Sequence, residues 1–128
     1  MDGFHVLGYQ PYSVIRDVFK KSSVFVCPAR AKAFGLPVVE AMSAGLIPVT
    51  THRTGARDFV MKVHPKLVVS INKLSKRVTE VLSMDSDERS ELLTRGSEVA
   101  LSWNEETAKK VHLKAIGELL AAKNDYPE

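Results

Sequence analysis

Short runs rich in β-branched residues alternate along this chain with longer amphipathic segments, and this alternation limits the possible folds more than any other feature. The runs lie at 4–8, 23–27, 46–51 and 66–70. A segment with helical periodicity separates the first two, at 11–22, where an apolar stripe is formed by Val14, Ile15, Val18 and Phe19. Strands that alternate with helices predict an α/β fold with a parallel sheet.

The four runs predict a Rossmann-like, three-layer αβα domain with a short parallel sheet of about four strands. The run at 23–27 is apolar, as expected for a strand covered on both faces, and it stops at Pro28, which cannot donate to a ladder. We expect the strand at 4–8 to lie beside it, because a right-handed crossover joins adjacent parallel strands well. The strands would then follow sequence order, and an unfilled edge would favour self-association.

The rest of the chain has the periodicity of helices. Asp85 with Glu88 predicts the capped start of one helix, and Ser102 with Glu105 the start of a last helix over about 103–123. A length of 128 residues is typical of one domain. We therefore expect a single, partial domain over 1–128, with its core at 4–100 and extra helices towards the C-terminus.

Charge and cysteine content narrow the classes of function. Eighteen Lys and Arg against fifteen Asp and Glu give a net charge of +3, which favours small anions but is too low to indicate a nucleic-acid partner. The lone Cys27 provides neither a disulfide framework nor a paired metal motif, so a reducing compartment is expected. Neither a signal peptide nor a transmembrane segment is apparent. We expect a cytoplasmic protein with no metal and no other cofactor.

The most informative segment follows the run at 23–27. A loop leads to a predicted helix start at Phe34, Gly35, Leu36 and Pro37, with Glu40 one turn later. Ligands of open parallel sheets bind beyond the carboxyl ends of the strands, and free N–H groups at a helix start suit phosphate. Glu40 is suited to accept hydrogen bonds from neutral hydroxyls such as a ribose diol. Spacing alone equally allows that Glu40 only balances the helix dipole and that Gly35 only forms a tight turn.

A resemblance to a known family favours the first interpretation. Residues 28–49 read PARAKAFGLPVVEAMSAGLIPV. This segment closely resembles the donor-site signature of retaining GT-B glycosyltransferases of family 4, approximately P-S-x-x-E-G-F-G-L-P-x-x-E-A-M-A-x-G-x-P-V. The similarity continues at Val6-Leu7-Gly8, at 51–60, which resembles the family's T-x-x-G-G-x-x-E-x-V loop, and at Leu101-Ser102-Trp103.

The resemblance implies the C-terminal, donor-nucleotide-binding domain of such an enzyme, acting on a UDP- or GDP-sugar without a metal. Glu40 would bind the ribose of the donor, and the backbone at Phe34, Gly35 and Leu36 would border its sugar and diphosphate. Thr54 and Gly55 lie in the resembling loop at 51–60 and are candidates to line the site. His52 and Arg53 follow the run at 46–51 at its carboxyl end, which makes them further candidates to line a site.

Two departures from the family pattern shape the functional expectation. Lys32 stands where the family has the Glu of its sugar-transfer centre, and a Lys cannot accept hydrogen bonds from sugar hydroxyls, although it can contact a phosphate. No catalytic residue is therefore assigned. The family's donor domain also has two further βα units and a separate acceptor domain before this region. We expect a truncated chain that is inactive alone and is completed by a missing N-terminal half or a second chain. The alternative is a non-catalytic nucleotide-binding or scaffolding module.

Overall fold

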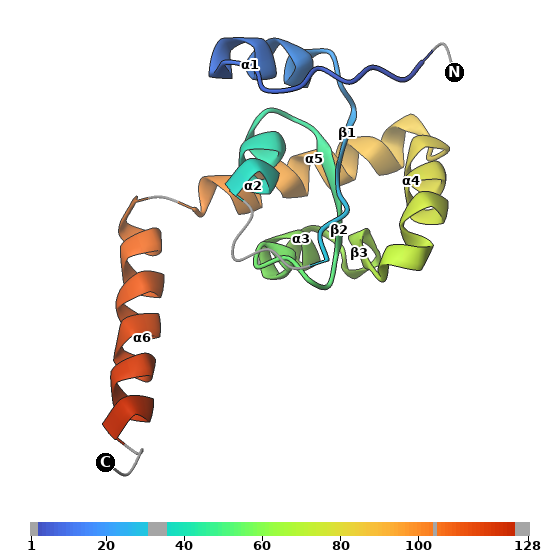
Figure 1. The fold of residues 1–128 in the computed structure, drawn as a ribbon. Coiled ribbons are helices and arrows are strands. Elements are labelled where there is room, and N and C mark those ends of the chain that lie inside the picture. Colours follow the sequence, from blue (N-terminus) through green and yellow to red (C-terminus); the bar gives the residue numbers. More distant parts are fainter. Residues whose placement is uncertain (1–2, 31–35, 104, 125–128) are drawn as a thin grey trace.

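The computed structural model describes residues 3–30, 36–103 and 105–124 (Figure 1). The elements in chain order are α1 (Tyr12–Lys20), β1 (Val24–Cys27), α2 (Leu36–Ser43), β2 (Ile47–Thr51), α3 (Arg57–Val63), the 3-10 turn η1 (Pro65–Leu67), β3 (Val68–Val69), the 3-10 turn η2 (Ile71–Lys73), α4 (Leu74–Leu82), α5 (Ser86–Leu101) and α6 (Glu105–Asn124).

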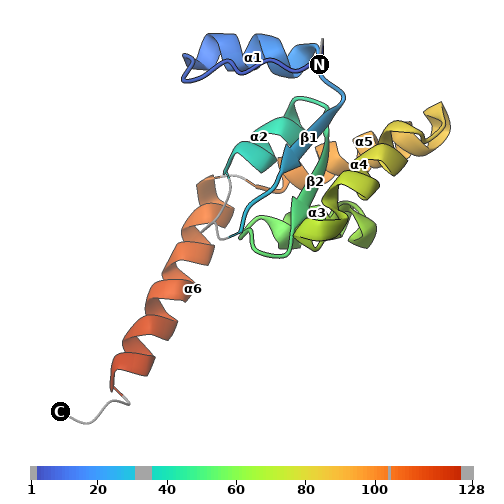
Figure 2. The same ribbon diagram turned by 45° about the vertical axis from the view of Figure 1, so that its right-hand side comes forward.

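The three described strands form one parallel sheet in the order β1-β2-β3, which confirms the predicted α/β class. Cys27 pairs with Thr50, and Thr50 pairs in turn with Val68 on the other side. In Figures 1 and 2, α2 and α3 lie on one side of β2 and α4 on the other, while α5 packs against both α2 and α3. This gives the layered, Rossmann-like arrangement that the alternation of runs predicted.

The core lies between the sheet and these helices. All five residues of β2 are buried, as expected for a central strand with helices on both faces. Fully buried apolar side chains come from α2, α3, η1 and α4 and include Val38, Met42, Val60, Val63, Leu67 and Val81. The carboxyl end of β2 is therefore held on all sides, which makes it a rigid base for the loop that follows.

The prediction of a fourth strand at 4–8 is wrong. This segment is neither helix nor strand, and Phe4, Val6 and Leu7 are 72%, 82% and 52% exposed. The reason is the position of α1, which lies across the amino end of β1 instead of along a face of the sheet (Figure 1). Helix α1 contacts the sheet through Phe19, which packs edge to face against Phe25 with ring centroids 5.8 Å apart. The crossover that would bring 4–8 beside β1 is thus not formed.

Local interactions determine two helix ends, whereas the predicted helix start at Ser102 is not formed. Gly45 has a φ of 85° and ends α2, with Leu46 N–H donating to the Ala41 carbonyl at 3.0 Å. Asp85 Oδ1 accepts from the backbone N–H of Glu88 at 2.8 Å and caps α5. Ser102 does not open the last helix, since its hydroxyl donates to the Val99 carbonyl and so belongs to the end of α5.

Helix α6 projects from the rest of the domain in both ribbon views (Figure 2). Four of its large aliphatic side chains are exposed, namely Leu113, Ile116, Leu119 and Leu120. Among the described residues, no helix is long and apolar enough to cross a membrane.

Candidate functional site

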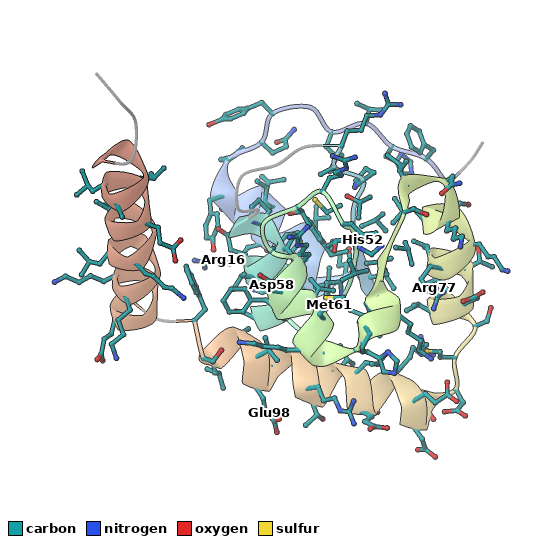
Figure 3. The ribbon with its side chains drawn as sticks, turned by 90° about the horizontal axis from the view of Figure 1, so that it is seen from below. Arg16, His52, Asp58, Met61, Arg77 and Glu98 are labelled. Carbon is teal, nitrogen blue, oxygen red and sulfur yellow. The ribbon has the colours of Figure 1, made fainter. Side chains whose placement is uncertain are left out.

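A pocket of about 560 Å³ opens where the carboxyl ends of the three strands meet, at the edge of the sheet that faces the viewer in Figure 3. We call it the strand-end pocket. Its lining comes from Ala29 and Arg30 after β1, from Thr51, His52 and Arg53 at the end of β2, and from Ser70 and Ile71 after β3. The volume lies in the usual range for small-molecule sites, and the position is where open parallel sheets bind ligands.

Hydrogen bonds fix the backbone around this pocket. The Thr51 hydroxyl donates to the carbonyl oxygen of Ala29, which ties the end of β2 to the segment after β1. Arg57 Nη1 donates to the carbonyl oxygen of His52 at 2.8 Å, so the first residue of α3 holds the loop after β2. On the third side, the Ser70 hydroxyl donates to Asn72 Oδ1 at 2.7 Å. The first of these bonds joins the ends of β1 and β2, and the other two fix the segments that follow β2 and β3.

The strand-end pocket is basic. Arg30, His52 and Arg53 contribute to its lining, which contains no carboxylate among the described residues. Neither Arg30 nor Arg53 makes an ion pair or a side-chain hydrogen bond with a described residue. A concave surface with positive charges of this kind attracts anions.

The model of one protein family, the group 1 glycosyl transferases, matches residues 1–99 of the chain. The chain belongs to this family. A search of the curated proteins found no match. The edge of the sheet that carries the strand-end pocket is therefore part of a glycosyl transferase domain, in agreement with the resemblance of residues 28–49.

Several residues expected at the donor site of this glycosyl transferase fold lie outside the described residues. These are Lys32, Phe34 and Gly35, together with the rest of 31–35. Leu36 begins α2 and Pro37 lies in its first turn, as the helix preference of proline predicts. Glu40 is exposed one turn into α2 and does not line the strand-end pocket.

In the loop at 51–60, some of the expected site residues line the strand-end pocket and others do not. His52 lines it, and Figure 3 shows this side chain near the middle of the edge. Thr54 is buried, is not part of the pocket lining, and has a hydroxyl without a hydrogen-bond partner among the described residues. Its carbonyl accepts from Arg57 N at 3.2 Å, in the turn that precedes α3. Gly55 is half-buried and is also absent from the lining.

Sequence reasoning did not single out Arg30, Ala29, Ser70 or Ile71. Each lies one to three residues beyond the end of β1 or β3, whereas His52 follows β2. Position just beyond a predicted parallel strand is the signal that identifies them, because all such positions meet at one edge. Within the described part of the chain, no three His, Cys, Asp or Glu side chains form a group able to hold a metal ion.

His64 lies at a second, smaller pocket of about 280 Å³ between η1 and α5. Its Nδ1 accepts from the backbone N–H of Lys66 at 3.1 Å and so caps η1. Burial lowers the pKa of His64, and the positive charges of Lys66 and Arg95 lower it further. The neutral imidazole is the form that can accept this hydrogen bond, because both ring nitrogens of the cation are donors.

Proposed function

We propose that this chain binds a nucleotide-sugar donor, a UDP- or GDP-sugar, at the carboxyl edge of its sheet. The observation that carries the proposal is the strand-end pocket, which is basic and is built by the ends of three parallel strands. Ala29 and Arg30 of its lining lie within residues 28–49, the segment that resembles the donor-site signature. Membership of the glycosyl transferase family supports the same assignment.

Glu40 is proposed as the ligand of the donor ribose. The carboxylate is exposed one turn into α2 and makes no ion pair with a described residue, so its oxygens are free to accept hydrogen bonds. The position is separate from the strand-end pocket. A neutral diol beside Glu40 and an anionic group beside the arginines would avoid contact between the carboxylate and phosphate.

The chemical role that we propose is to position the donor and to stabilise the departing diphosphate. Lys32 replaces the carboxylate that the family places at its transfer centre. This replacement favours a second candidate, in which the chain binds nucleotide without transferring sugar. A cytoplasmic location is also proposed, on the basis of the lone, buried Cys27, whose free thiol suits a reducing compartment.

Calorimetric titration of the full chain with UDP, GDP and ADP tests the proposal. We expect binding by UDP or GDP, and Glu40→Ala should weaken it about tenfold, the usual cost of a lost hydrogen bond to a charged group. Glu98→Ala is the matched control, since Glu98 is an exposed carboxylate on α5, away from the edge of the sheet (Figure 3). Failure of all three nucleotides to bind at millimolar concentration would disprove the proposal.

Measurement of sugar transfer separates the two candidates. A full chain that binds UDP-sugar but shows no transfer to water or to an added acceptor, with or without the change Lys32→Glu, supports nucleotide binding alone. Transfer by the unmodified chain would show that Lys32 is compatible with catalysis. The nucleotide titration is the same in both cases, so the binding proposal is tested independently of activity.

A further inference from the structure

Two arginines reach the strand-end pocket from neighbouring strands at equivalent positions. Cys27 of β1 pairs with Thr50 of β2. Arg30 lies three residues beyond Cys27, and Arg53 lies three residues beyond Thr50. Both residues lie just beyond the ends of their strands, and both line the strand-end pocket. Pairing of β1 with β2 therefore places at one pocket two arginines that are distant in sequence.

These guanidinium groups have no partner among the described side chains. The ion pairs of the described residues involve other cations, and no acidic residue lines the strand-end pocket. Two like charges on one concave surface repel each other, and a bound anion relieves this repulsion. The planar guanidinium fork matches the oxygens of phosphate with two parallel hydrogen bonds, which makes arginine suited to this ligand.

The third arginine of this edge has a different role. Arg57 donates to the His52 carbonyl at 2.8 Å, and its Nε lies 3.9 Å from Asp58 Oδ1. The Thr51 hydroxyl is likewise used by the carbonyl of Ala29. The groups that fix the loops are thus distinct from the two arginines that face the pocket.

We propose that Arg30 and Arg53 together bind a phosphate group in the strand-end pocket. Two sources have this chemistry, namely the diphosphate of a nucleotide donor and the phosphate of a phosphorylated acceptor sugar. The first source rests on the proposed function, whereas the second does not. In either case the site uses residues that follow β1 and β2, and it is separate from Glu40.

Titration of the full chain with inorganic pyrophosphate tests this site. The wild-type chain should bind pyrophosphate, and Arg30→Gln and Arg53→Gln should each weaken binding at least about tenfold, as expected for a lost charge-assisted hydrogen bond. The affinity of Arg53→Lys should lie between those of the wild-type chain and Arg53→Gln, because lysine keeps the charge and lacks the planar guanidinium fork. Arg16→Gln is the charge-matched control on α1, where the guanidinium stacks on Tyr12 at 5.1 Å. Circular dichroism verifies that each variant is folded.

Absence of pyrophosphate binding to the wild-type chain at millimolar concentration would overturn the inference. So would an affinity that the two glutamine variants leave unchanged, or that Arg16→Gln lowers equally. If pyrophosphate binds with this dependence on arginine while UDP, GDP and ADP do not bind, the phosphate site stands and the proposed donor function fails. If UDP binds and only Glu40→Ala weakens it, the donor function stands and the arginine site is refuted.

Comparison of UDP with uridine, and a titration with glucose 6-phosphate, then identify the source of the phosphate. A diphosphate bound by the arginines predicts that Arg53→Gln lowers the affinity for UDP and leaves that for uridine unchanged. A phosphorylated acceptor predicts that glucose 6-phosphate binds to the chain saturated with UDP, and that Arg53→Gln removes this binding. Both results support the phosphate site and differ only in the ligand that carries the group.

Discussion

Arg57 donates a hydrogen bond of 2.8 Å to the carbonyl oxygen of His52, so the start of α3 is attached to the loop that lines the strand-end pocket. This bond joins a helix that packs in the core to a loop that is exposed. The position of His52 and Arg53 thus depends on a residue that does not itself line the pocket.

Replacement of Arg57 tests this dependence. We expect Arg57→Gln to weaken pyrophosphate binding by about threefold to tenfold, since the loop that carries Arg53 loses its attachment, and to lower the free energy of unfolding by about 1 kcal/mol or less. Arg77→Gln is the control, because Arg77 pairs with Glu80 within α4 at 3.2 Å. Calorimetry and urea denaturation measure the two effects. An equal loss of affinity in both variants would show that net charge, and not the loop, is responsible.

His64 makes stability depend on pH. Its pKa in the folded chain is lowered below the ordinary value of about 6.5, so the unfolded chain binds a proton more readily. The contribution of His64 is therefore complete above about pH 6.5 and is lost as the pH falls towards the folded-state pKa. We expect His64→Asn, which can still accept from Lys66 N, to reduce the loss of urea stability between about pH 7 and pH 5. An unchanged pH dependence would rule out His64 as its source.

Two methionines that differ in burial test whether the core stabilises the fold. Met42 is 1% exposed in the core, whereas Met61 is 41% exposed on α3 (Figure 3). Met42→Ala should lower the free energy of unfolding by about 2–5 kcal/mol, because it removes buried surface and leaves a cavity. Met61→Ala should change it by less than about 1 kcal/mol. Urea denaturation of the two variants measures the difference, and similar values would contradict the described core.

The cap of α5 is expected to contribute to stability through one hydrogen bond. Asp85→Ala removes the acceptor of the Glu88 N–H and should cost about 1 kcal/mol. Asp85→Asn keeps an acceptor and should cost less. Asp87→Ala removes the same charge from the first turn without loss of the cap, so its effect measures the helix dipole alone. A thermal denaturation series in which Asp85→Ala and Asp87→Ala coincide would exclude the capping bond as the cause.

Local features were predictable from the sequence because local chemistry determines them. The apolar runs that became β1, β2 and β3 were recognised, although β3 is shorter than expected because Lys66 and Leu67 belong to η1. Asp85 caps α5, as its spacing from Glu88 predicted. Each of these outcomes depends on residues within a few positions of one another.

The run at 4–8 shows where this reasoning fails. Phe4, Val6 and Leu7 have the composition of a strand, yet a strand needs a partner, and α1 does not place them beside β1. Ser102 had the sequence of a helix start, but its hydroxyl bonds back to Val99. Both errors have the same cause. A local sequence pattern shows that a strand or a helix start can form, but contacts with the rest of the chain determine whether it does form.

The sequence by itself determined the α/β class, the parallel strands with the helices between them, and the resemblance that family membership confirmed. Only the tertiary structure decided that Arg30, His52 and Arg53 share one pocket with Ser70, and that Thr54 and Glu40 lie outside it. The physical reason is that pairing of β1, β2 and β3 brings residues that are far apart in the sequence to one edge of the sheet. This proximity follows from strand pairing and not from any local pattern.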